Sequence, residues 1–232
     1  MATKLWVFGD SFSTYDMPPS KDNPTGKVEH PSWIALTCKG LDISESTIYA
    51  DYGVSNDWIF HQFIENMHQM DTGDYVIIQP TQKHRQWFFE EPSLANYWLK
   101  DLEKHVSKEE KNAVEAYVTY LQNDRLDDLR YVQFGLALER LSQMAQHLRI
   151  LVLPGFFGVT GVTGTLISIC DGEFADVNVV GGNFYQANGG IDPRLNHMSA
   201  ENHEILANKV VEFFTNGTTI DLTTGFKTGF IK

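Results

Sequence analysis

The stretch Leu5-Trp6-Val7-Phe8-Gly9-Asp10-Ser11, near the start of the 232-residue chain, decides how the rest of the sequence is interpreted. Its apolar run ends in a glycine, a pattern typical of a short buried strand. Asp10 and Ser11 would then stand directly beyond the end of that strand. Because ligands of open α/β sheets bind beyond the carboxyl ends of the strands, polar residues at this position are candidates for function.

Further apolar runs along the chain predict strands at residues 46–50, 74–79 and 149–153, with a short fifth strand at 177–180. The run from Tyr75 to Ile78 is continuous rather than alternating, which indicates a strand covered on both faces, as in a parallel sheet. Helices are expected over 31–40, from a cap at Ser55 or Asn56 onward, and over 200–214. Strands that alternate with helices predict βαβ units and an α/β fold around one parallel sheet.

The segment 93–148 is rich in Lys, Glu, Leu and Ala and predicts two or three helices. It is longer than a simple crossover requires, so we interpret it as a helical insertion or lid. Residues 1–217 are expected to form one domain. The remaining tail, 218–232, contains two Thr-Gly-Phe units and is a candidate assembly arm.

The composition excludes several classes of function. With 30 acidic and 18 basic side chains, the net charge of −12 disfavours binding to nucleic acid or to a membrane surface. Cys38 and Cys170 have no metal-ligand spacing and predict no disulfide framework, and no other cluster suggests a metal or a cofactor. We see no signal-peptide core and no membrane-spanning run, and therefore expect a cytoplasmic protein, or a virion-associated one if a phage encodes it.

Polar residues that suit nucleophilic acyl transfer follow the predicted strands. Ser11 follows the first strand and is the candidate nucleophile, and Gly53 follows the second, where its backbone could approach a substrate closely. Asp192 and His197 precede the last helix; the histidine would be the base and the carboxylate would orient it. Asp10 is interpreted as a residue that holds the turn by hydrogen bonding. The remaining candidates for the oxyanion or substrate site are Asn56, Thr81, Gln82 and Arg85.

In these residues the sequence resembles the SGNH/GDSL hydrolase family. Gly9-Asp10-Ser11 is similar to the first family block, which carries the nucleophile, and Gly53-Val54-Ser55-Asn56 to the second, whose glycine donates to the oxyanion hole. The run from His197 to His203 resembles the last block, with His197 as the catalytic histidine; His203 is expected to be a packing or surface residue. The resemblance implies a flavodoxin-like three-layer α/β/α sandwich.

Two positions depart from the family pattern. The third block usually supplies an asparagine to the oxyanion hole, whereas Gln79-Pro80-Thr81-Gln82 contains none. Thr81 aligns with that position, and Gln79 or Gln82 could donate instead. The family acid usually stands two or three residues before the histidine, whereas Asp192 stands five before His197. Asp192 could still reach the ring, or the site could work as a Ser–His dyad with a backbone carbonyl in its place.

The resemblance implies a serine esterase that acts on small acyl esters, with carbohydrate acetyl esters among the candidates. Arg85 could bind an acidic substrate group or be a solvated surface side chain, and Trp87-Phe88-Phe89 could line the site or pack in the core. The alternative is a catalytically weak or inactive SGNH-fold protein with a binding or structural role, because its third block is degenerate. The sequence also resembles SGNH-like proteins of tailed phages, which would make it a virion component. A homo-oligomer assembled through the tail is also open. A flavodoxin-like nucleotide binder is disfavoured because no phosphate-binding glycine loop follows the first strand.

Overall fold

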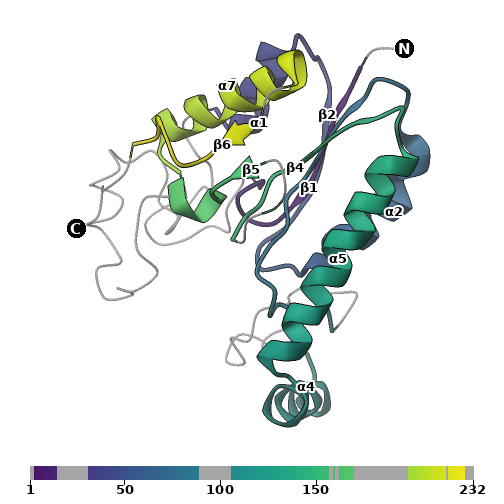
Figure 1. Ribbon diagram of the computed structural model, residues 1–232. Helices are drawn as coiled ribbons and strands as arrows, with labels where there is room; N and C mark the ends of the chain where they lie inside the picture. The colour runs from purple at the N-terminus through teal and green to yellow at the C-terminus, as the bar shows by residue number, and fades with distance from the viewer. Residues whose placement is uncertain are drawn as a thin grey trace.

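The computed structural model describes residues 3–14, 31–88, 106–156, 159, 162–169, 198–217 and 219–227. Within these residues, four parallel strands form one sheet in the order β2-β1-β3-β4 (Figure 1). Their bounds are β1 Leu5–Gly9, β2 Ser46–Ala50, β3 Tyr75–Ile78 and β4 Arg149–Val152. The prediction of an α/β fold with a parallel sheet is therefore confirmed.

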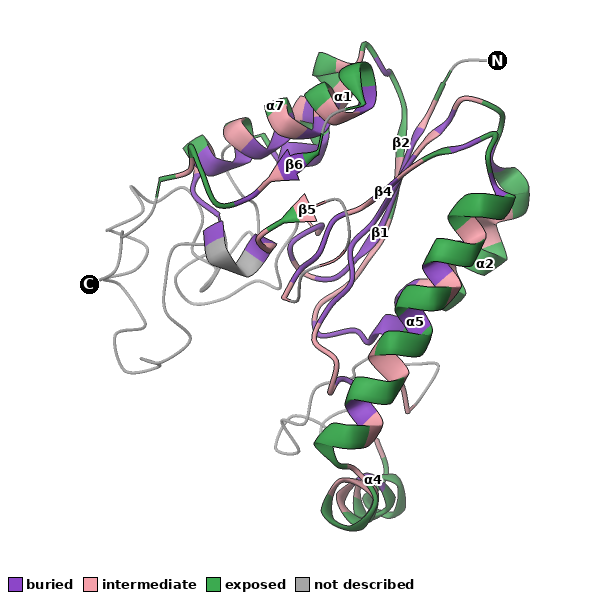
Figure 2. Ribbon diagram, in the orientation of Figure 1, coloured by how far each residue is buried: buried purple, intermediate pink, exposed green. Residues whose placement is uncertain are grey.

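Helices cover both faces of this sheet. Helices α1 (Trp33–Gly40) and α7 (Ala200–Asn216) pack on one face, and α2 (Asn56–Asn66) and α5 (Asp124–Met144) on the other (Figure 1). Successive strand residues point to opposite faces, so Leu5 and Val7 belong to the first core cluster and Trp6 and Phe8 to the second. This two-sided burial explains why the two inner strands, β1 and β3, are continuously apolar (Figure 2).

The predicted helical insertion is in part a layer of the fold. It contains α4 (Lys108–Tyr120), which begins with a capping box at Ser107, and α5, which starts after the cap residue Asn123. Phe134 and Leu138 of α5 are buried in the second core cluster, together with Ile59 and Phe63 of α2. Helix α5 therefore serves as the crossover between β3 and β4, and the interpretation of the whole segment as a lid is wrong for this helix.

The domain boundary expected at residue 217 is also corrected. Strand β6 (Ile220–Asp221) pairs with β5 (Val162–Thr163) in a second, two-stranded parallel sheet, and Ile220 and Leu222 are buried in the first core cluster. The Asn202 side chain donates to the carbonyl oxygen of Lys227 and accepts from its N–H, both at 2.8 Å. Residues 219–227 therefore complete the domain and do not form a free assembly arm.

Other elements agree with the sequence to within a few residues. Ser55 caps α2, Ser32 caps α1, and two short 3-10 turns span Met67–Gln69 and Leu166–Ile169. The strand expected at 177–180 and Cys170 lie outside the described residues. Among the helices that the structure describes, none combines the length and the apolar character needed to cross a membrane.

Candidate functional site

Ser11 lies at the point where the strand order of the sheet reverses. The central strand β1 has β2 on one side and β3 on the other, so the connections to these two neighbours run in opposite directions. The loops beyond β1 and β3 separate there, and this is where ligands of open α/β sheets bind. Half-buried Ser11 follows β1, and Gln79 and Thr81 follow β3.

A β-turn holds Ser11 in place. The Ser13 N–H donates to the Asp10 carbonyl oxygen at 2.9 Å, which puts Ser11 and Phe12 at the two central positions of the turn. The Asp10 side chain is fully buried and accepts the Phe12 N–H at 3.1 Å. The prediction that Asp10 holds the turn by hydrogen bonding is therefore confirmed.

Besides this backbone N–H, three side chains donate to the Asp10 carboxylate. Its Oδ1 accepts from Gln79 Nε2 at 2.7 Å, and its Oδ2 accepts from Thr81 Oγ1 at 2.6 Å and from Arg85 at 3.0 Å. Burying a carboxylate is costly unless it is hydrogen-bonded and paired with a positive charge, as it is here. The nucleophile candidate thus stands next to a fully bonded buried anion, which fixes the backbone on its N-terminal side.

Arg85 has a role that the sequence did not indicate. It is 8% exposed, forms an ion pair with Asp10 and lies over the ring of Phe156, with 5.4 Å from its guanidinium carbon to the ring centroid. The expectation of a solvated surface arginine is therefore wrong, because the side chain is buried and its charge pairs with Asp10, while a role in binding an acidic substrate group stays a prediction. Burial lowers the pKa of neighbouring His84, and the positive charge of Arg85 lowers it further.

Gln79 links both sides of the switch point and is a supporting residue whose role sequence reasoning did not resolve. Its Oε1 accepts from the Ser13 hydroxyl at 2.7 Å and from the Asp10 N–H at 3.3 Å, while its Nε2 serves the Asp10 carboxylate. A Cβ at Gly9 would lie 2.6 Å from that Oε1, so only glycine fits there. The signal in the sequence was a glutamine that directly follows the apolar run Tyr75–Ile78.

Two of the predicted donors face the interior. The Thr81 hydroxyl donates its single proton to Asp10, and Thr81 is fully buried, so it is not placed to hold an oxyanion. The Asn56 side chain accepts the Thr81 N–H at 2.8 Å and donates to the Thr81 carbonyl oxygen at 3.2 Å. Both residues, assigned from sequence to the oxyanion or substrate site, instead join α2 to the end of β3.

Gly53 and Gln82, two other predicted donors, lie beyond the ends of β2 and β3. Gly53 is buried with φ at 67°, a left-handed conformation that favours glycine. Gln82 is half-buried, and its Oε1 accepts from Arg85 Nε at 3.2 Å. No described residue accepts from the Gln82 Nε2 group, so the amide is oriented by its oxygen while its N–H donors remain unused within the described part of the chain.

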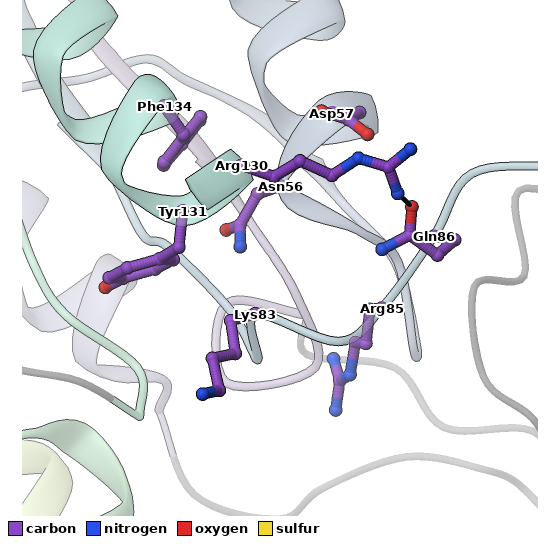
Figure 3. A pocket seen from close by; sticks show the side chains of 8 residues that line it. All are labelled: Asn56, Asp57, Lys83, Arg85, Gln86, Arg130, Tyr131 and Phe134. Carbon is purple, nitrogen blue, oxygen red and sulfur yellow. Dashed lines mark hydrogen bonds between the residues drawn. The ribbon is translucent and has the colours of Figure 1, made fainter. Parts of the chain in front are cut away.

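A small cavity lies behind this network and offers no room for a substrate. Its volume is about 10 Å³, which suits a single water molecule. Figure 3 shows the Arg130 side chain reaching the Gln86 amide across it, while the Arg85 guanidinium points away from Arg130. The lining residues are Asn56, Asp57, Lys83, Arg85, Gln86, Arg130, Tyr131 and Phe134.

The structure describes only one of the two histidines of the last family-like block, His203. His203 is buried on α7, and its Nδ1 accepts the N–H of Trp33 at 2.9 Å, which confirms a packing role. His197 and Asp192 lie outside the described residues. Trp87 and Phe88 contact His61 and Tyr117 respectively, and Phe89 lies outside the described residues.

Comparison of the chain with models of protein families gives no matching family, and no curated protein matches its sequence.

Proposed function

We propose that the chain is a serine hydrolase of the SGNH/GDSL type, with a flavodoxin-like three-layer sandwich, that cleaves small acyl esters such as carbohydrate acetyl esters. The observation that carries this proposal is the position of Ser11. It stands at the corner of a turn that a buried carboxylate network fixes, beyond β1 at the reversal of strand order. Fixed placement of a nucleophile is what acyl transfer requires.

In the proposed mechanism, the Ser11 hydroxyl attacks the ester carbonyl while His197 takes its proton. Asp192 orients the imidazole and stabilises its protonated form. The oxyanion is held by the N–H groups of Ser11 and Gly53, and we assign the third donor to the Gln82 amide because Thr81 serves Asp10. His197 then protonates the leaving alcohol, and water releases the acyl group from Ser11.

One observation favours the second candidate, a binding or structural protein with little catalytic activity. Thr81, which aligns with the family's oxyanion donor, and Gln79, an alternative donor, both bond to Asp10 in the interior. A site with fewer donors would hold an acyl group but stabilise its transition state less. A virion component would fit this candidate.

Labelling with a fluorophosphonate, together with turnover of p-nitrophenyl acetate, tests the proposal. We expect labelling and turnover in the wild type and their loss in Ser11→Ala and in His197→Ala. Ser13→Ala is the matched control: it removes a hydroxyl from the same turn, one that bonds to Gln79 at 2.7 Å, and labelling should persist. A wild type that neither labels nor turns over above Ser11→Ala would refute the hydrolase and favour the binding protein.

A further inference from the structure

Helix α5 carries an apolar stripe on the side that faces away from the sheet. Leu129, Val132 and Leu136 are 53%, 56% and 60% exposed, although they lie in the middle of a 21-residue helix. Their spacing of three and four residues places them on one face. Helical spacing places the buried residues Phe134 and Leu138 on the opposite side, where they contact the core. The exposed stripe is thus additional to the face that folding requires.

Charged residues flank the stripe in a self-complementary order. If a second α5 packs antiparallel with Val132 on the two-fold axis, residues at equal distances before and after Val132 face each other. Arg125, seven positions before, then faces Glu139, seven positions after, and Asp124 faces Arg140 in the same way. Each opposite-charge pair occurs twice in the dimer because of the symmetry. Neither Arg125 nor Glu139 has an ion-pair partner among the described residues.

Gly135 fits the same arrangement. A glycine inside a helix costs about 1 kcal/mol relative to alanine. Nothing in the described part of the chain requires glycine here: its φ is negative, and a Cβ would meet no described atom within 4 Å. In the antiparallel pair, Gly135 stands opposite Leu129, three positions on either side of Val132. The missing side chain provides the space that a leucine from a facing helix would fill.

We propose that the protein forms a two-fold symmetric homodimer through antiparallel packing of α5 against α5 of a second copy, centred on Val132. This surface is separate from the proposed active site. Helix α5 packs through Phe134 and Leu138 on the second core cluster, whereas Phe12, next to Ser11, belongs to the first cluster on the other face of the sheet. One helix pair provides an interface at the small end of the range for specific complexes. The dimer is therefore in equilibrium with the monomer, and its fraction depends on protein concentration.

Sedimentation of the full-length chain over a wide concentration range tests the proposal. The wild type should shift from the monomer mass towards twice that mass as concentration rises. Val132→Glu brings two carboxylates together on the axis and should leave only monomer. Met144→Glu is the control, because Met144 is exposed at the end of α5 but lies off the stripe, so its mass distribution should match the wild type.

Charge reversal tests the register. Arg125→Glu alone and Glu139→Arg alone each create two like-charge contacts and should weaken the dimer about tenfold or more. The double variant Arg125→Glu/Glu139→Arg restores opposite charges and should return the dimer to its wild-type strength. Circular dichroism and thermal melting confirm that each variant is folded. A wild type that stays monomeric, a dimer that Val132→Glu leaves intact, or a folded double variant no stronger than the singles would each overturn the proposal.

Discussion

Asp10 is the residue on which the geometry of the candidate site depends most. Asp10→Asn retains the shape of the side chain but places an amide NH2 against groups that are themselves donors. It also removes the negative charge, so Arg85 is left buried without its ion-pair partner. We expect a loss of about 3 kcal/mol in the free energy of unfolding, since breaking one side of a buried ion pair is strongly destabilising. Urea unfolding followed by tryptophan fluorescence measures it. An exposed acid in an ion pair, Glu45→Gln, is the control and should cost well under 1 kcal/mol; equal losses in the two variants would contradict the network's importance.

Variants of Gln82 and Thr81 can distinguish a side chain that donates to the substrate from one that supports the structure. If Gln82 donates to the oxyanion, Gln82→Ala should lower kcat for p-nitrophenyl acetate by about a hundredfold with little change in stability. Thr81→Val removes the hydroxyl that serves Asp10, so its main effect should be on the urea midpoint. Steady-state kinetics and unfolding curves on both variants give the comparison. A Gln82→Ala enzyme with unchanged kcat would remove Gln82 from the proposed mechanism.

At the residue scale, the sequence predicted which residues follow a strand better than which residues contact each other across neighbouring strands. Ser11 and Gly53 could be placed because each follows a recognisable strand. Arg85 could not, because its role depends on Asp10, 75 positions away, which becomes its neighbour only when β1 pairs with β3. A single sequence contains no direct sign of that contact.

At the scale of elements, His203 joins two helices. The Trp33 N–H is in the first turn of α1 and has no partner within its own helix, so His203 Nδ1 on α7 accepts it. His203→Leu would leave that buried donor unsatisfied, and we expect a loss of about 2 kcal/mol in the free energy of unfolding. Chemical denaturation measures the loss. His197→Ala is the comparison variant: it should abolish turnover and leave the unfolding midpoint close to the wild type, and the reverse pattern would exchange the two histidines' roles.

The types and bounds of several strands and helices could be predicted from local sequence patterns. Ser46–Ala50 is the predicted second strand, and α7 begins at Ala200 as expected, because apolar runs and capping residues are local signals. Strands β5 and β6 were missed because each contains only two residues, too few for any periodicity. Helix α5 was interpreted as an insertion because its amphipathic pattern does not say which surface it covers.

At the scale of the whole molecule, the domain ends later than its last helix. Ile220 and Leu222 are almost fully buried, and burying one such side chain contributes about 1.5–3 kcal/mol. A chain that ends at residue 217 should therefore lose about 3 kcal/mol or more of stability, which a thermal or urea melt would show. A chain that ends at Lys227 keeps the contacts with Asn202 and should melt close to the full-length protein. Equal stability of the 217 and 227 chains would show that the second sheet contributes nothing.

The place of residues 219–227 in the core has a consequence for the order in which the fold can form during synthesis. The first core cluster joins Leu5 to Leu222, 217 positions further along the chain. Helix α1 can cover part of this face of β1 early, but the cluster is complete only after Leu222 has been synthesised. Contacts between such distant residues form slowly, and exposed apolar strands invite aggregation meanwhile. Chains stalled before Leu222 has left the ribosome should thus be captured by chaperones and cut by proteases more readily than chains that contain it.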